Sequence, residues 1–556
     1  MEWLNENSRK FLDNGYLVNW QTAEDRIRKM ADTAEKILKK DGFSDKLYNY
    51  ASKWFYSFSS PIWSNFGNKR WLPISCFGSY IGDSMAKILY TTAEVWMMSK
   101  YWWGTSAYFG DIRERWSSIK DNWTSSWSVH FMQLFDKNID IVSQWAVRRW
   151  SFAAYLPIEH NDIEEFLEIG KEGNPIQRIT TWITVWDKWL EEMKNGDVKK
   201  RAIWAKVIQA RGEMGYPYIF FSDNVNNNTV DVYKDKKMKI YASNLCTEIM
   251  LPSNDNESFV CCLSSMNIAK YDEWKDTDAV ETMIYFLDAI MEEFITKLEE
   301  IRDSKESDAK IAFNFMEKSY NFAKNHRALG LGALGYHSYL QSKMIAFESP
   351  EAAKLNKEIF KLIKEKSYKA SEDLAKEYGE APHLKWYGRR NTTLNSIAPT
   401  TSSAFILGQV SQSIEPWWSN SYVKDLAKMK VTIKNVELEK LLESKGENTR
   451  EIWASIRDKD GSVQHLECLS DKEKEVFKTF SEINQYAIID QASDRQKYTD
   501  QAQSLNLMIH PDTSAKDINS LYIDAWKQGI KSLYYQHSKS AAQELSRKIS
   551  CVGCEA

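Results

Sequence analysis

Glycine is scarce in this chain of 556 residues. Average usage of about 7% would supply about 39 glycines, whereas the sequence has 22 glycines and 23 tryptophans. Several tryptophans stand in polar, turn-like segments such as KYWWGTS, although turns favour small residues. The chain shows neither internal repeats nor low-complexity segments. Biased composition of one segment therefore does not explain the tryptophans in turns.

Other absences narrow the class of protein. No apolar run approaches the roughly 18 residues that cross a bilayer, and the N-terminus MEWLNENSRKF has neither a signal nor a transit pattern. A net charge of −4 with short, mixed basic runs excludes a basic surface for nucleic acid. Seven unevenly spaced cysteines favour free thiols in a reducing compartment over a disulfide framework. We expect a cytoplasmic enzyme-sized protein that binds neither a membrane nor a nucleic-acid polymer.

Hydrophobic patterning predicts an α/β protein. Residues 1–53 carry helical periodicity with many charges and predict a short helical cap. Between 54 and 270 short apolar runs alternate with helices, and residues 275–380 are largely helical. The segment RRNTTLNSIAPTTSSAFILGQ then offers a strand, a loop and the start of a helix. This order indicates one extended α/β core.

Two motifs have competing interpretations. The sequence GLGALG at 330–335 matches a dinucleotide-binding pattern, but it follows a helix-prone segment instead of a strand. We favour the interpretation that these small residues let helices approach closely. The alternative, a nicotinamide oxidoreductase, would require a strand that ends at Leu329. The carboxylates around His160 could suggest a metal site, but an N-cap at Asn161 or Asp162 with an acidic first turn explains them more simply. We expect no metal in this chain.

The segment SNLCTEIMLP carries the sharpest chemical pattern. If it is extended, its two-residue period places Asn244, Cys246 and Glu248 on one face. On this stretch alone, a buried cysteine among polar loop residues is the simpler interpretation. Two further apolar segments, VCCLSSMN with Cys261 and LPISC with Cys76, also bear thiols. The three segments could converge in one site.

The sequence CVGC, with Cys551 and Cys554, lies two residues before the last residue of the chain. A C-x-x-C pair three residues apart at a chain end contributes little to core packing and is too solitary for four-ligand zinc. Such a pair favours a mobile redox dithiol.

Together these motifs resemble the large catalytic subunit of class I ribonucleotide reductase over nearly the whole chain. The resemblance rests on SSPIWSNFG, LPISCFGSYIGDS, SNLCTEI, VCCLSSMN, HRALGLGALGYHSYL, APTTSSAFILGQVSQSIEP, SLYYQHS and CVGC. It implies a ten-stranded α/β barrel of two five-stranded halves with a central finger loop, over residues 54–540. The helical cap at 1–53 would lack a complete ATP-cone, and residues 541–556 would form a flexible redox-active tail.

The resemblance also implies an activity and the residues that carry it. The enzyme would be a ribonucleoside-diphosphate reductase, which makes 2'-deoxyribonucleotides for DNA precursor synthesis by a thiyl-radical mechanism. Cys246 would hold the thiyl radical, Glu248 would act as general base and Asn244 would hold the ribose hydroxyls. Cys76 and Cys261 would reduce the substrate and finish as a disulfide. The tail thiols would then reduce that disulfide, whereas the remaining two cysteines, Cys262 and Cys468, have no implied role.

Further implied residues bind nucleotides or carry the radical. Tyr534 and Tyr535 would relay the radical from a separate, metal-containing small subunit, so no cofactor binds in this chain. Implied substrate contacts are Ser60, Ser75, Pro399, Thr400, Thr401, Ser402 and Ser403. Implied effector contacts are Asp83, Arg113, Gln144 and Arg148. The other implied partners are ribonucleoside diphosphates, dNTP or ATP effectors, a thioredoxin or glutaredoxin, and a second copy in a homodimer.

The resemblance offers an explanation for the tryptophans. The family pattern has glycine at ten tryptophan positions, namely Trp54, Trp71, Trp102, Trp103, Trp116, Trp123, Trp127, Trp145, Trp150 and Trp182. All ten exchanges go from glycine to tryptophan, which points to translation with the wrong genetic code. The codon UGA is read as glycine in some bacterial lineages and as tryptophan in a common alternative code. We hypothesise that many of these tryptophans stand for glycine. The alternatives are genuine divergence and a catalytically inactive nucleotide-binding homologue with a regulatory role.

Overall fold

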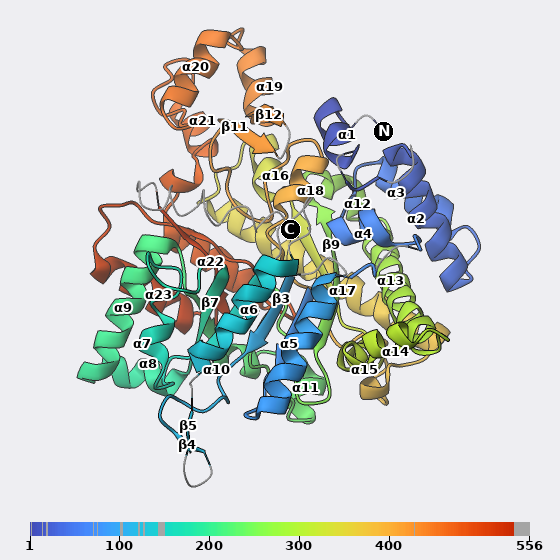
Figure 1. Ribbon diagram of the computed structural model, residues 1–556. Coiled ribbons are helices and arrows are strands. Elements are labelled where there is room, and N and C mark those ends of the chain that lie inside the picture. The colour runs from blue at the N-terminus through green and yellow to red at the C-terminus, as the bar shows by residue number, and fades with distance from the viewer. Residues whose placement is uncertain are drawn as a thin grey trace.

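The computed structural model describes residues 1, 3–13, 15–17, 21–69, 72–74, 76–100, 104–119, 123–125, 128–142, 151–426 and 429–538 (Figure 1). Strands and helices alternate through the barrel, and no helix in these ranges is long and apolar enough to cross a membrane. The mixed α/β class predicted from the patterning is confirmed.

The principal sheet of the described residues has nine strands. They are β1 (Tyr56–Phe58), β2 (Cys76–Tyr80), β3 (Gly104–Tyr108), β6 (Phe152–Pro157), β7 (Ile179–Val185), β8 (Tyr218–Phe221), β9 (Phe259–Asn267), β10 (Leu329–Leu334) and β14 (Ser532–Leu533). Five of them, β2, β3, β6, β7 and β8, pair in parallel in that order. Antiparallel pairing joins β9 to β2 and β14 to β8, at the two edges of this five-stranded half.

Backbone pairing closes the sheet into a barrel. On its other side β9 pairs in parallel with β10. Isolated parallel bridges then extend from β10 to residues 395–397 and from there to residue 503. The amide of Tyr534, directly after β14, donates to the carbonyl of Leu505 at 2.9 Å. Since β14 pairs with β8, this path of backbone pairings through the described residues returns to its start and closes the barrel. The α/β barrel expected from the resemblance is confirmed.

The parallel strands are buried on both faces. Every residue of β6 and six of the seven in β7 are buried. Parallel sheets covered by helices on one side and packed side chains on the other require such continuous apolar runs. The alternation of apolar runs with helices between 54 and 270 therefore marks this half of the barrel.

The motif GLGALG forms strand β10, so the expectation of closely packed helices there is wrong. A Cβ on Gly330 would lie 2.3 Å from the Ser396 hydroxyl, and one on Gly332 would lie 2.4 Å from the Ser396 carbonyl oxygen. The glycines thus let the neighbouring strand segment approach. The dinucleotide interpretation also fails, because β10 begins at Leu329 instead of ending there.

Helices surround the barrel on the outside (Figure 1). Those packed around the first half and the chain start are α1 (Glu6–Asp13), α2 (Ala23–Leu38), α3 (Phe43–Ser52), α4 (Ser60–Asn65), α5 (Met85–Lys100), α6 (Ser128–Val142), α7 (Ile163–Phe166), α8 (Asp187–Lys194), α9 (Val198–Met214), α10 (Ser222–Asn227) and α11 (Asp231–Asp235). The later helices are α12 (Tyr271–Trp274), α13 (Ala279–Arg302), α14 (Ser307–Asn314), α15 (Glu317–His326), α16 (Tyr336–Ser342), α17 (Pro350–Tyr378), α18 (Thr401–Ile406), α19 (Val436–Ser444), α20 (Arg450–Asp458), α21 (Asp471–Val476), α22 (Gln485–Gln496) and α23 (Ala515–Lys527). Short 3-10 turns are η2 (Ile268–Lys270), η3 (Pro382–Leu384) and η4 (Phe480–Glu482).

Two parts of the chain extend from the barrel in different ways. Helices α2 and α3 pack on α13, and their apolar side chains join the main core. Helices α19 to α21 instead enclose a smaller core of their own beside the hairpin of β11 (Ser421–Leu426) and β12 (Met429–Lys434). This lobe projects at the top of Figure 1. The remaining short strands are β4 (Ser118–Ile119), β5 (Trp123–Thr124), β13 (Leu507–Met508) and β15 (Gln536–His537).

Candidate active site

A tight loop between residues 243 and 250 carries the predicted catalytic residues. Ser243 and Met250 form an antiparallel bridge, and the amide of Asn244 donates to the carbonyl of Ile249 at 3.2 Å. Thr247 sits at the turn with a φ of 71°. The extended strand considered for 244–248 is therefore wrong: the segment is a hairpin turn, which brings its polar side chains together by bending instead of by alternation. We call residues 243–250 the finger loop.

Glu248 is a buried carboxyl group beside Cys246. Burial raises the pKa of Glu248 to about 7, although hydrogen bonds from Asn244 and Ser504 favour its ionised form. The Ser504 hydroxyl contacts the backbone carbonyl of Cys246 and lies 3.4 Å from Oε2 of Glu248. A carboxyl group with a pKa near neutrality can both accept and return a proton at neutral pH.

Cys76 and Cys261 are cross-strand partners in β2 and β9. Directly opposed residues of antiparallel strands have Cα atoms about 4.5–5.5 Å apart, within the range that a disulfide spans. Their side chains share one face of the sheet. The Asn244 amide lies 3.7 Å from Sγ of Cys76, so this thiol pair adjoins the finger loop. Cys76, Cys261 and Cys246 are thiols that are not joined in disulfides.

Burial raises the pKa of the Cys261 thiol well above its usual range. Its sulfur also accepts a hydrogen bond from Gln501 Nε2 at 3.5 Å. The neighbouring Cys262 is buried as well and, by strand alternation, projects from the opposite face. Burial thus favours the protonated form of the Cys261 thiol at neutral pH.

Tyr534 and Tyr535 lie against each other, with ring centroids 4.5 Å apart. Tyr534 is buried, and its ring stacks 6.3 Å from that of Trp182, which stacks 4.8 Å from Tyr155. The Tyr155 hydroxyl donates to the carbonyl of Asn244 at 3.1 Å. In the sequence as written, aromatic rings therefore connect the tyrosine pair to the finger loop, through Trp182, one of the tryptophans hypothesised to stand for glycine.

The predicted nucleotide contacts fall in two places. Ser60 begins α4, and Thr400 is the N-cap of α18 with its hydroxyl accepting from the amide of Ser413 at 2.7 Å. Pro399 precedes this cap, and the next three predicted residues form the first turn of α18: Thr401, Ser402 and Ser403. Asp83 and Arg113 form an ion pair at 2.7 Å. The other predicted contacts and the tail thiols lie outside the described residues: Ser75, Gln144, Arg148, Cys551 and Cys554.

Two of the ten questioned tryptophans adopt a backbone that favours glycine. Trp54 and Trp116 both have a φ of 68°. Trp116 is 70% exposed, whereas the Trp54 indole donates to the carbonyl of Leu407 at 2.9 Å. Trp182 lies in strand β7 and is fully buried, and within the described part of the chain its indole N–H has no hydrogen-bond partner. Trp123 lies in β5. The others lie outside the described residues: Trp71, Trp102, Trp103, Trp127, Trp145 and Trp150.

The N-cap interpretation of the acidic segment after His160 is confirmed in position only, because the Asp162 side chain makes no capping hydrogen bond to α7. Asp162 is the N-cap of α7. Its carboxylate accepts from the backbone amides of Arg115 and Ser128, both at 3.1 Å. The His160 ring contacts the carbonyl of Ile112 at 2.9 Å. The Asp162 carboxylate and the His160 ring are thus both used in contacts with backbone groups.

Sequence reasoning missed several residues that contact the site. Ser504 and Gln501 touch the finger loop and a reactive thiol, and Tyr155 holds the loop from β6. Glu415 is a second buried carboxyl group whose pKa burial raises to about 7; Asn506 donates to it. Nothing local marks these positions, because each becomes relevant only through a partner far away in the chain. Glu415 lies inside the motif SQSIEP, which carried the resemblance without suggesting a role.

Comparisons with known proteins agree with this geometry. A family profile described as "Ribonucleotide reductase, barrel domain" matches residues 74–198, 190–386 and 382–536. The chain is 30% identical over 573 residues to the ribonucleoside-diphosphate reductase large subunit of Invertebrate iridescent virus 3, covering 89% of this chain and 88% of that protein. It is 27% identical over 600 residues to the ribonucleoside-diphosphate reductase subunit alpha of Chlamydia trachomatis, covering 90% and 55%. It is similar to the solved Actinobacillus ureae class Id ribonucleotide reductase alpha subunit, with 56% identity, a TM-score of 0.90 and 99% coverage of both chains.

Proposed function

This chain belongs to the ribonucleotide reductase family, and we propose that it is the large, catalytic subunit of a ribonucleoside-diphosphate reductase. One observation supports this most directly: the finger loop lies beside the thiol pair on β2 and β9, with a buried carboxyl group on the same loop. Radical reduction of a ribose requires a hydrogen-abstracting thiyl, a proton acceptor and a two-electron dithiol. Cys246, Glu248 and the Cys76–Cys261 pair would supply these three groups.

The reaction follows from these groups. A thiyl radical on Cys246 takes the 3'-hydrogen of the ribonucleotide, and Glu248 accepts the proton of the 3'-hydroxyl as the 2'-hydroxyl leaves as water. Cys76 and Cys261 supply two electrons and two protons, one to the departing water and one to the 2'-carbon, and form a disulfide, while Glu248 returns its proton to the 3'-oxygen. Cys246 then returns its hydrogen to the 3'-carbon and recovers the radical. Asn244, whose amide lies beside Cys76, orients the ribose hydroxyls.

Partners complete the cycle. A separate small subunit supplies the radical, which enters through Tyr535 and Tyr534; their contact and the buried position of Tyr534 suit a short transfer path. Cys551 and Cys554 pass electrons from a thioredoxin or glutaredoxin to the active-site disulfide by thiol exchange. A deoxynucleotide or ATP effector binds near Asp83 and Arg113 in a homodimer, and the enzyme works in the cytoplasm.

The substrate diphosphate binds at the start of α18. The hydroxyls of Thr400 to Ser403 and the backbone amides at a helix start are suited to anionic oxygens. Ser60, at the start of α4, supplies a further hydroxyl.

Replacing Cys246 with Ser tests the proposal. The variant should bind nucleoside diphosphate like the wild type, since the change is one atom in a buried loop, but should form no deoxynucleotide with the small subunit and a reductant present. Deoxynucleotide formation by this variant would exclude Cys246 as the radical site. If the wild-type chain binds nucleotide but never turns over with any matched small subunit, the inactive regulatory homologue becomes the better description.

A further inference from the structure

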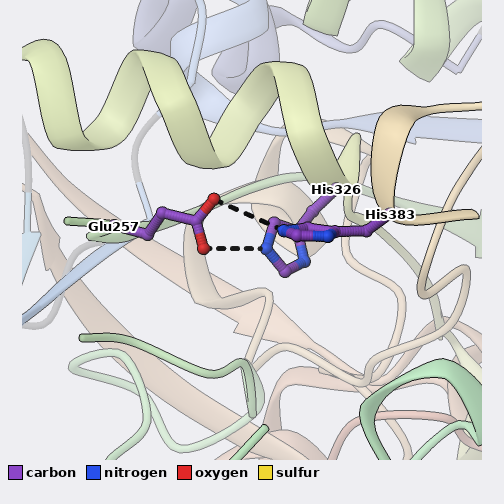
Figure 2. A group of neighbouring side chains, drawn as sticks. All are labelled: Glu257, His326 and His383. Carbon is purple, nitrogen blue, oxygen red and sulfur yellow. Dashed lines mark hydrogen bonds and ion pairs between the residues drawn. The ribbon is translucent and has the colours of Figure 1, made fainter. Parts of the chain in front are cut away.

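A second cluster of polar side chains lies at the loop that leads into the start of strand β9. Glu257 stands in that loop, His326 is the last residue of α15 and His383 is in η3. Figure 2 shows both imidazole rings turned toward the two oxygens of the Glu257 carboxylate. None of these residues has a role in the mechanism proposed above.

The spacing of the three side chains suits one small cation. Nε2 of His326 lies 3.3 Å from Oε2 of Glu257, and Nε2 of His383 lies 3.5 Å from Oε1. The potential ligand atoms of all three residues lie within 4.8 Å of one another. Ligand atoms about 2.0–2.2 Å from a tetrahedral ion are separated by about 3.3–3.6 Å. An ion could therefore enter with a small inward movement of the side chains.

Hydrogen bonds around His326 orient its Nε2 toward the cluster. Its Nδ1 lies 3.2 Å from the Tyr233 hydroxyl, which donates its own hydrogen to Thr392 Oγ1 at 2.8 Å. The tyrosine oxygen can then accept from Nδ1–H, which leaves a lone pair on Nε2 facing a carboxylate oxygen. In the other tautomer Nε2–H donates to Oε2 of Glu257; in the tautomer described here, two acceptors at this distance repel unless a cation lies between them. A partner for the second ring nitrogen is also the usual support of a metal-binding histidine.

The remaining contacts hold the ligands in place. The His326 ring stacks on Phe322 with centroids 3.9 Å apart, and Asn325 Nδ2 donates to Oε1 of Glu257 at 2.7 Å. The side chain of His326 is fully buried, whereas that of His383 is 26% exposed. The cluster is thus rigid on one side and open to solvent on the other, so that an ion could enter and keep a water ligand.

We propose that Glu257, His326 and His383 bind a divalent transition metal ion, Zn²⁺ first among them, with water completing the coordination. Two imidazoles and one carboxylate are a common ligand set for zinc with an open position. The proposal departs from the sequence-based expectation that the chain contains no metal. It does not depend on the proposed reductase activity.

The ion would tie together three segments that are far apart in the sequence. Glu257 is four residues before Cys261, which sits on β9, and His326 directly precedes the approach to β10. Binding to the folded state alone raises stability in proportion to the logarithm of ligand concentration over its dissociation constant. Zinc should therefore stabilise the junction of β9 and β10 without taking part in the radical reaction.

Metal analysis of the full chain tests the site. The starting protein carries Cys551→Ser and Cys554→Ser, so that the tail dithiol cannot bind zinc. After removal of metal with a chelator and reloading, we expect about one zinc ion per chain by mass spectrometry, and a visible absorption band when Co²⁺ replaces Zn²⁺. Added zinc should also raise the melting temperature.

Variants assign the binding to this cluster. His383→Ala, at the half-open edge, should lose the stoichiometric zinc, the cobalt band and the thermal shift while keeping the same circular dichroism spectrum. His465→Ala is the matched control, because His465 is an exposed histidine on the separate lobe and should behave like the parent. Glu257→Gln gives an isosteric second variant should His383→Ala not fold.

Two results would overturn the proposal. One is a parent protein that, reloaded with zinc, retains less than a tenth of an ion per chain. The other is equal zinc content in the parent, His383→Ala and Glu257→Gln proteins, which would place any bound metal at the active-site thiols instead.

Discussion

Glu248 should control how the rate of deoxynucleotide formation depends on pH. Burial raises its pKa to about 7, so the ionised fraction is about 10% at pH 6 and about 90% at pH 8 by simple titration. An exposed glutamate with a pKa of about 4.3 would be almost fully ionised at both values. If the carboxylate is the base, kcat/KM should rise about tenfold between pH 6 and pH 8.

Substitution of Glu248 should also lower the rate by a predictable factor. Glu248→Gln keeps the shape and removes the proton acceptor, and positioned general bases contribute about 10²–10⁴-fold in rate. This corresponds to about 3–5 kcal/mol of transition-state stabilisation at 1.36 kcal/mol per tenfold. Nucleotide affinity should change little, because the amide fills the same space.

The assay measures initial rates of deoxynucleotide formation at limiting nucleoside diphosphate, with the small subunit and reductant in excess so that neither sets the rate. Ser504→Ala serves as the control: it removes a hydroxyl 3.4 Å from Oε2 of Glu248 that favours the ionised form, so the midpoint should move to higher pH. A profile flat between pH 6 and pH 8, or a Glu248→Gln variant with more than a tenth of wild-type activity, would refute the reasoning.

Three further predictions concern the tail, the tyrosines and the tryptophans. Cys551→Ser with Cys554→Ser should stop turnover driven by a protein reductant but allow a single turnover of prereduced enzyme; equal loss in both assays would contradict the relay. Tyr534→Phe or Tyr535→Phe should abolish activity in rate assays while pull-down shows the small subunit still bound, since phenylalanine cannot form the phenoxyl radical, and full activity in either would remove that residue from the path. Peptide mass spectrometry of the native protein across residues 101–127, which hold five tryptophans as written, should find glycine at most of them. A left-handed backbone costs a bulky residue about 1–3 kcal/mol per site; five intact tryptophans there would defeat the recoding hypothesis.

The sequence by itself determined the family and the barrel, and it supplied the residues that we propose as reactive groups. Continuous apolar runs such as FAAYLP in β6 predict strands buried on both faces, because local patterning and burial act on the same few residues. Motifs such as SNLCTEI and SLYYQHS are short enough to be recognised without a structure. The order of strands and helices predicted an α/β core for the same reason.

Local patterns failed where tertiary contacts override them. The GLGALG segment follows a helix, so its glycines suggested helix packing. It forms a strand because it pairs in parallel with β9, and its glycines leave room for the backbone and side chain of Ser396. The segment at Asn244 to Glu248 alternates like a strand but bends into a hairpin; within the described part of the chain, its one β-bridge joins Ser243 to Met250 at its own base.

The tertiary structure alone decided which distant groups meet. The pKa of Glu248 depends on burial by the surrounding barrel, and the contacts of Ser504 with the finger loop join positions more than 250 residues apart. The cluster of Glu257, His326 and His383 likewise assembles from a loop, a helix end and a 3-10 turn. A sequence specifies chemistry within a few residues of a position, whereas proximity across the chain and the loss of solvent that shifts a pKa arise only when the barrel closes.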